Sequence, residues 1–161
     1  MIALAEEMQG PMTIGEISWQ RAGTSGSAQG FYNSFEICLG LAEIDELSDN
    51  YESNYVPGSR VRVYSTATQT MSADPDQWMT IQLDTPFFYD GTHNLLVEIK
   101  WVGGSNMFFT YMWETGTNRG LMNKNDAGSP TGTLYTRMSR LMFSPASSLE
   151  QYTFGAIKAL W

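Results

Sequence analysis

Two alternating runs of apolar residues within residues 77–101 constrain the fold more than any other stretch of this sequence. In the first run the apolar positions are Met79, Ile81 and Leu83. In the second run they are Leu95, Val97, Ile99 and Trp101. A period of two residues is typical of a β-strand with one buried face. Between the runs, Pro86 cannot donate to a β-ladder and Asp90-Gly91 tolerates positive φ, so the pattern predicts two strands separated by a fixed turn.

Short alternating runs continue along the rest of the chain. We expect further strands at residues 12–20, 31–39, 60–65, 106–113 and 133–143, and a short acidic helical turn at 42–53. In the strand at 31–39, Phe31 and Phe35 share one face with Ile37 and Leu39, and Tyr32 belongs to the other. With 15 Gly, 6 Pro and 13% aromatic residues, the composition favours an all-β fold over a helical bundle. We predict an antiparallel two-sheet sandwich over residues 12–143, with an apolar N-terminal extension at 1–11 and a C-terminal docking tail at 144–161.

The central segment also resembles a known module. Trp78 and the run TIQLDTPFFYDGTHNLLVEI match the pattern W...I.LDTPF.YDG..NLLVEI, which marks an uncharacterised β-sandwich module of secreted, modular bacterial surface proteins. The stretches ALAEEMQGPMTIGEISWQRAG, FYNSFEICLGLAEIDELSDNY and GTLYTRMSRLMF are similar to its opening, second and closing strands, whereas residues 104–124 depart from it. The resemblance implies a jelly-roll-like sandwich on or outside the cell, and it implies no enzymatic activity.

Charge and cysteine usage exclude several classes of partner and linkage. The formal net charge is −8 and no cluster of Lys or Arg forms a stripe for successive phosphates, which argues against nucleic acid and anionic membranes. Cys38 is the single cysteine, so no internal disulfide can form, and its apolar surroundings indicate a buried strand residue. The sequence has no apolar run of the roughly 18 residues needed to cross a bilayer, and residues 1–20 lack a signal-peptide pattern. The chain is therefore either cytosolic or begins after processing, and the resemblance favours the extracellular alternative.

The sequence offers no strong catalytic or metal-binding motif. The only histidine, His93, lies in the turn DGTHN, where turn chemistry explains it better than a catalytic triad does. Of the acids within apolar strands, Glu98 and Glu114, the first is two residues from Lys100 and is expected to form an ion pair on a solvent-exposed face. A structural calcium ion would need oxygen-rich loops such as those with Asp45, Asp49 and Glu52, or with Asp74 and Asp76, but no EF-hand spacing is present. We expect no cofactor.

Apolar residues in unusual places suggest association between copies. Residues 106–113 are apolar on both faces of the expected strand, although a strand of a two-layer sandwich should have one solvent-exposed face. Both chain ends are apolar as well. We therefore expect a non-catalytic extracellular structural protein that associates with identical copies, as a fibre or surface-layer subunit, by exchange of terminal segments or strands. The residues expected to take part are Ile2, Leu4, Met8, Phe108, Met112, Tyr152, Phe154, Ile157, Leu160 and Trp161.

A carbohydrate-binding or adhesive module is the alternative function. Exposed aromatic rings on a β-sandwich can stack on sugars beside polar side chains. The candidate contact residues are Trp101, Tyr111 and Trp113, and Tyr51 and Tyr55 are further candidates. Filling the core is nevertheless the commoner role of aromatic residues at alternating positions.

Overall fold

The computed structural model, which describes residues 1–23 and 27–146, is an all-β fold built from several antiparallel sheets. The long strands are β2 (Met12–Gln20), β3 (Gln29–Ala42), β4 (Val61–Ser72), β5 (Trp78–Tyr89) and β6 (Asn94–Lys100). The short strands are β1 (Ile2–Ala3), β7 (Gly104–Ser105), β8 (Met112–Glu114), β9 (Gly120–Met122), β10 (Thr133–Tyr135), β11 (Arg137–Ser139) and β12 (Leu141–Pro145). Two single 3₁₀ turns, η1 (Ala5–Glu7) and η2 (Glu52–Asn54), complete the secondary structure of these residues.

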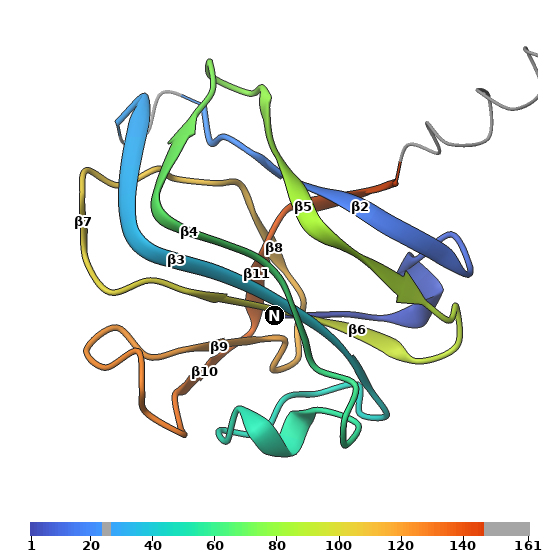
Figure 1. Ribbon diagram of the computed structural model, residues 1–161. Helices are drawn as coiled ribbons and strands as arrows, with labels where there is room; N and C mark the ends of the chain where they lie inside the picture. The colour runs from blue at the N-terminus through green and yellow to red at the C-terminus, as the bar shows by residue number, and fades with distance from the viewer. Residues whose placement is uncertain (24–26, 147–161) are drawn as a thin grey trace, which may run out of the picture.

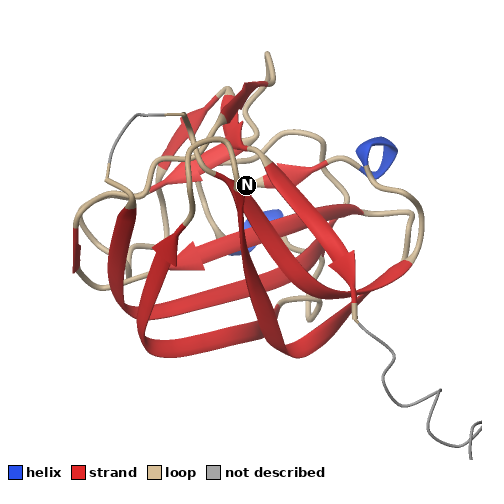
Figure 2. Ribbon diagram, turned by 90° about the horizontal axis from the view of Figure 1, so that it is seen from above, coloured by secondary structure: helices blue, strands red, loops and turns tan. Residues whose placement is uncertain are grey.

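Two sheets form the body of the sandwich (Figure 1). The larger sheet has the strand order β1-β6-β3-β4, with β7 paired to β3, and the smaller sheet has the order β12-β2-β5. Small two-stranded sheets, β9-β10 and β8-β11, are also present. The view turned by 90° shows the strands arranged in layers around the core (Figure 2). The prediction of an all-β antiparallel sandwich is confirmed.

The inner faces of the two sheets meet in the main hydrophobic core. Residues with little or no exposed surface come from both sheets, among them Ile17 and Trp19 of β2, Ile37 and Leu39 of β3, and Val97 of β6. The alternation predicted for residues 77–101 places Ile81 and Leu83 in this core as well. Burying large apolar side chains in this way contributes roughly 1.5–3 kcal/mol each.

The strands β5 and β6 follow one another in the chain but belong to different sheets. β5 pairs with β2, and β6 pairs with β1 and β3. Gly91 has a φ of +77° at the turn between them, a conformation that glycine adopts without steric cost. Asp90 stabilises the same turn because its Oδ1 accepts hydrogen bonds from the backbone N–H groups of Thr92 and His93. The predicted turn is present and carries the chain from one layer to the other.

β6 is covered on both faces. Leu95 and Val97 point into the sandwich core, whereas Leu96 packs on the outer face in a second cluster with Ile2 and Leu47. The segment between β3 and β4, together with β9 and β10, supplies the covering residues of this second cluster. The larger sheet is therefore a middle layer along β6.

The N-terminal segment, residues 1–12, is part of the sandwich. Ile2 and Ala3 pair with Leu96 and Leu95 at the edge of the larger sheet, and Ile2 has no exposed surface. The segment contains both extended and helical backbone, because strand β1 is followed after Leu4 by the 3₁₀ turn η1. The segment expected as an extension at 1–11 thus supplies an edge strand to its own domain.

Three local predictions were wrong. Tyr32 is buried in place of Phe31. Ser34 has a φ of +49°, and this irregularity shifts the alternation of buried and exposed side chains by one position between Tyr32 and Phe35. The single strand expected at 133–143 is three short strands with three different partners. The acidic segment 42–53 forms bends, and its only helical turn is η2 near its end.

The prediction of a strand at residues 106–113 is also wrong for most of these residues. Asn106 has a φ of +58°, which interrupts an extended strand, and only residues 112–114 form a strand, β8. Before β8 the chain runs beside the end of β2, where Thr110 forms an isolated bridge with Arg21. The segment therefore has no continuous sheet to bury its apolar side chains.

Candidate functional site

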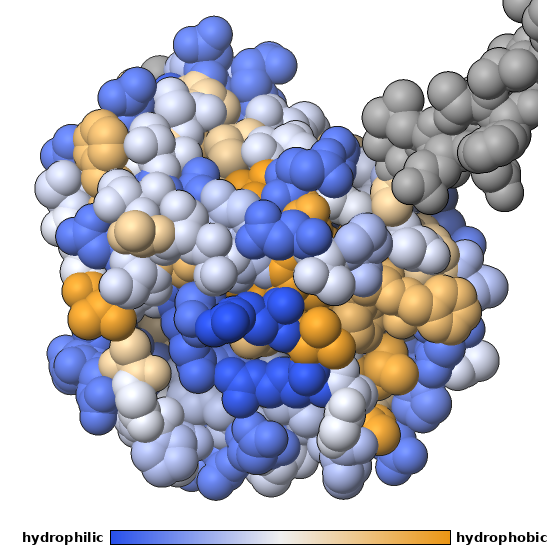
Figure 3. Space-filling model, viewed as in Figure 1, coloured by the Kyte–Doolittle hydropathy of each residue, from blue (hydrophilic) through white to orange (hydrophobic). Residues whose placement is uncertain are grey.

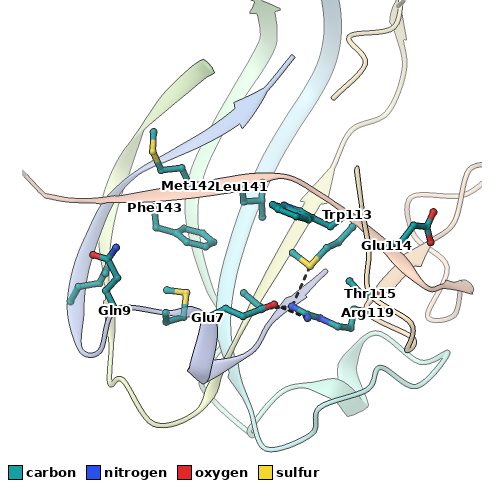
Figure 4. A pocket seen from close by; sticks show the side chains of 13 residues that line it. Glu7, Gln9, Trp113, Glu114, Thr115, Arg119, Leu141, Met142 and Phe143 are labelled. Atoms are coloured by element: carbon teal, nitrogen blue, oxygen red, sulfur yellow. Dashed lines mark hydrogen bonds and ion pairs between the residues drawn. The ribbon is translucent and has the colours of Figure 1, made fainter. Parts of the chain in front are cut away.

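A groove of about 640 Å³ lies between the N-terminal segment, β8 and β12 (Figure 4). We call it the β12 groove. Its apolar lining includes Met8, Met12, Trp113, Met138, Met142 and Phe143. A volume of this size lies within the range of pockets that bury a small organic ligand or a few side chains of a peptide. Methionine is flexible and polarizable, so a lining with four methionines adapts readily to irregular apolar shapes.

An ion pair between Glu7 and Arg119 closes the floor of the β12 groove. Arg119 is buried, and its Nε and Nη2 each donate to the backbone oxygen of Ile2 at 3.1 Å. Its Nη1 donates to Oε1 of Glu7 at 2.9 Å. The hydrogen bond from Arg119 lowers the pKa of Glu7 below its usual value. Glu7 is therefore a carboxylate at neutral pH and is occupied by Arg119, so it is poorly suited to act as a general acid.

Trp113 belongs both to this groove and to a cluster of aromatic rings around a cation. The guanidinium of Arg140 lies 4.5 Å from the ring centroid of Trp113 and 5.2 Å from that of Tyr111. The hydroxyl of Tyr111 donates to Asp76, and this hydrogen bond raises the pKa of Tyr111. Arg140 Nη1 also donates to Gln20 at 2.7 Å. Contacts of this kind hold the two rings in fixed positions.

The structure brings together two of the three residues expected to contact a glycan. Tyr111 and Trp113 share Arg140, whereas Trp101 packs edge-on against Tyr32 with ring centroids 5.5 Å apart. Trp101 lines a separate cavity of about 200 Å³ beside Tyr51 and Tyr55. The sequence offered no sign of Arg140, because its aromatic partners are more than twenty residues away in the chain.

Exposed apolar side chains concentrate in residues 107–113, which we call the 107–113 segment. The exposed fractions are 58% for Met107, 47% for Phe109, 44% for Met112 and 52% for Trp113. Phe108 is different, since it is buried in the main core and its N–H donates to the hydroxyl of Tyr32. The expectation that Phe108 faces another copy is therefore corrected, and Met112 keeps an exposed side chain.

The N-terminal residues expected to associate with another copy are occupied within their own chain. Ile2 is fully buried, and Leu4 and Met8 are half-buried, with Met8 packed against the main core. The prediction that these residues contact another copy assumes that the N-terminal segment lies outside the sandwich. That assumption is wrong, because β1 pairs with β6. The remaining predicted contacts, Tyr152, Phe154, Ile157, Leu160 and Trp161, lie outside the described residues, as does the tail from 147 onward.

The face over β3 and β4 is strongly hydrophilic at its centre (Figure 3). A cross-strand charge pair lies there, since Arg62 of β4 pairs with Glu36 of β3 at 3.1 Å. Arg60 bridges two carboxylates, Glu52 at 3.0 Å and Glu98 at 2.8 Å. These basic side chains therefore neutralise acids of their own chain.

Glu98 forms the predicted ion pair with Lys100, at 3.1 Å, but not on a solvent-exposed face. Only 8% of Glu98 is exposed, and its Oε2 accepts a hydrogen bond from the Tyr55 hydroxyl at 2.8 Å. Gly40 makes room for Tyr55, because a Cβ there would lie 2.5 Å from the ring. A carboxylate with three donors is a satisfied structural group rather than a catalytic acid.

The remaining chemical candidates are also engaged in structural contacts. Burial raises the pKa of the Cys38 thiol, which disfavours the nucleophilic thiolate. His93 Nδ1 lies 2.6 Å from Asp90 Oδ2 within the turn, as turn chemistry predicts. Asp45 accepts a hydrogen bond from Asn94, and Glu52 pairs with Arg60. In residues 1–23 and 27–146, no three His, Cys, Asp or Glu side chains are grouped so as to hold a metal ion.

Comparison with protein-family models, with curated proteins and with solved structures found no match. Within the described residues no helix has the length and apolar character required to span a bilayer.

Proposed function

We propose that this protein is a non-catalytic, extracellular structural subunit that associates with identical copies of itself into a fibre or surface layer. The observation that carries the proposal is the 107–113 segment, which leaves four large apolar side chains about half exposed, one of them, Trp113, in the lining of the β12 groove. Exposed apolar groups that gather in this way mark interaction surfaces. Covering them with a second copy would contribute on the order of 1 kcal/mol for each side chain.

The association is of the head-to-tail kind. Segment 147–161 and the 107–113 segment are different parts of one chain, and a contact between different parts of identical chains repeats into rings or open filaments. The N-terminal segment plays no part in the exchange, because β1 is paired within its own sheet. Segment 147–161 is therefore the one terminal segment that we expect to be exchanged between copies.

Two further considerations support the remaining parts of the proposal. The extracellular location rests on the resemblance of residues 3–143 to the surface-protein module. The non-catalytic role rests on the engagement of Cys38, Glu98 and His93 in structural contacts.

Electron microscopy and light scattering of the purified chain test this function. We expect filaments or sheets whose amount grows with concentration, and we expect monomers when Phe109 and Met112 are both replaced by Glu. The matched control is Phe88→Glu, because Phe88 is 66% exposed and lies in β5, outside the 107–113 segment. Monomers of the unmodified chain at every concentration would contradict the proposal, and so would equal loss of assembly in the control.

Glycan binding is the second candidate function, and the cluster of Tyr111, Arg140 and Trp113 favours it. Trp113 presents a half-exposed ring at the edge of a groove, held in place by Arg140. Titration with polysaccharides distinguishes the two functions. A glycan-binding module would show saturable affinity that is lost in Trp113→Ala, whereas a fibre subunit would show none.

A further inference from the structure

The β12 groove has an open sheet edge as one of its walls. Among the described residues, β12 is the terminal strand of the sheet β12-β2-β5 and pairs with β2 on one side only. Leu141, Met142 and Phe143 of this strand line the groove (Figure 4). An open edge beside a row of apolar pockets is the arrangement to which extended peptide segments add as a further strand.

The charges of the groove favour an apolar occupant over an ionic ligand. Arg119 is buried, and its guanidinium donates hydrogen bonds to the backbone oxygen of Ile2 and to the carboxylate of Glu7. Glu114 is exposed and points away from the other labelled side chains in Figure 4. What the groove offers is mainly the methionine-rich surface and the ring of Trp113.

Segment 147–161 has the composition of such an occupant. Its sequence, SSLEQYTFGAIKALW, carries Tyr152 and Phe154 two positions apart, as side chains on one face of a strand would be. Ile157, Leu160 and Trp161 follow. Leaving these apolar side chains in water would forgo roughly 1.5–3 kcal/mol each.

Segment 147–161 is long enough to reach a groove on a neighbouring molecule. Ala146 donates to the backbone oxygen of Thr13 at 2.8 Å, so the chain is still paired with β2 where the described part ends. Met12, next to Thr13, and Phe143 both line the groove, so the groove begins beside this end of the described part. An extended chain of about 15 residues reaches roughly 50 Å, which is ample to cross to an adjacent copy.

We propose that the β12 groove is the acceptor for segment 147–161, supplied by a neighbouring copy that adds it along the open edge of β12. This inference rests on the proposed function and names the β12 groove, to which Trp113 of the 107–113 segment belongs, as the surface that receives segment 147–161. Each copy then presents one groove and one segment, so the contact repeats from molecule to molecule.

A peptide-binding experiment tests the acceptor directly. The probe is a fluorescent peptide of residues 147–161, and the receptor is the full chain carrying Phe154→Glu and Ile157→Glu, which keeps the groove free. We expect saturable binding, weakened about tenfold or more when Trp113→Glu and Met142→Glu are added. Val102→Glu is the matched control, because Val102 is 71% exposed and lies outside the groove. Alanine versions of the two groove substitutions, checked by thermal unfolding, guard against a folding defect.

Mixing the variants separates the inference from the proposed function. The chain with a disrupted groove and the chain with a disrupted segment should each be monomeric, and together they should form a dimer that does not grow. Unimpaired assembly of the groove variant alone would overturn the acceptor assignment while leaving the proposed function intact. A monomeric unmodified chain with groove-dependent peptide binding would overturn the proposed function and leave the acceptor assignment in place. Peptide binding that ignores the groove substitutions, or no binding at all, would overturn the inference.

Discussion

The N-terminal segment and the 107–113 segment are both rich in apolar residues, yet the fold treats them differently. Ile2 is buried by pairing with β6 and is fastened through Arg119, whereas Met107, Phe109 and Met112 stay about half exposed. The N-terminal segment lies along β6, whose outer backbone N–H and C=O groups are available to pair with β1. The 107–113 segment is interrupted at Asn106, bridges the end of β2 at Thr110 and then pairs only with the short strand β11. An apolar run is therefore evidence of a core contact only where one of the main sheets offers an edge beside it.

The largest effect on the free energy of unfolding is expected when the side chain of Ile2, in the N-terminal segment, is shortened. We expect Ile2→Ala to lower the free energy of unfolding by about 2–5 kcal/mol, because it removes a fully buried side chain and leaves a cavity beside Leu96. Urea denaturation measures this change. A loss below about 0.5 kcal/mol would mean that β1 does not dock on β6 in solution.

Removing the hydrogen bonds that Arg119 donates to the N-terminal segment should have the next largest effect on the free energy of unfolding. We expect Arg119→Met to cost about 2 kcal/mol, because it leaves the carbonyl of Ile2 without its donors and breaks the pair with Glu7. Arg62→Met is the control, since its pair with Glu36 is largely exposed and should be worth less than about 1 kcal/mol. Equal losses in the two variants, measured in the same urea titration, would remove the special role of Arg119.

The same ion pair predicts a small dependence of stability on pH. The folded pKa of Glu7 is lowered from 4.5, so its contribution is present above pH 4.5 and is lost as pH falls through the lowered value. Because Glu7 is about half exposed, we expect less than about 1 kcal/mol. The measurement compares the unfolding free energies of the unmodified chain and Glu7→Gln from neutral pH to about pH 3. Identical acid dependence in both proteins would contradict the prediction.

The smallest effect on stability is expected in the 107–113 segment. Met112→Ala should change the free energy of unfolding by no more than about 0.5 kcal/mol, because the side chain is exposed and fills no cavity. Its effect should appear instead as weaker association at high concentration in light scattering. A loss of stability as large as that of Ile2→Ala would show that the segment is part of the core.

Sequence reasoning predicted the long strands well. Alternation identified the core-facing positions Ile81, Leu83, Leu95 and Val97, and the Asp90-Gly91 turn follows from local chemistry alone. Alternation failed for Leu96 and Glu98, which are also buried, and for Trp101, which lies beyond β6 and is 40% exposed. What alternation could not reveal is which strands pair. β5 and β6 lie in opposite sheets, and the choice depends on contacts with β2 and β3 that are distant in the sequence.

The candidate site was less predictable. The sequence placed Tyr111 and Trp113 among the candidate aromatic residues, but the β12 groove depends on Arg119, Glu7 and Arg140. The pair of Arg119 and Glu7 joins residues 112 positions apart, and no local pattern marks either of them. The positive φ of Asn106 and Ser34 likewise breaks an alternation that looks continuous in the sequence.

Sedimentation velocity over a wide range of concentrations tests the central claim most directly, with the full chain compared with a variant that lacks residues 147–161. We expect the full chain to grow into larger species as concentration rises. The truncated chain should remain a folded monomer with an unchanged unfolding transition. A full chain that stays monomeric at the highest concentration, together with a truncated chain that unfolds, would show that segment 147–161 completes its own core and would contradict the claim.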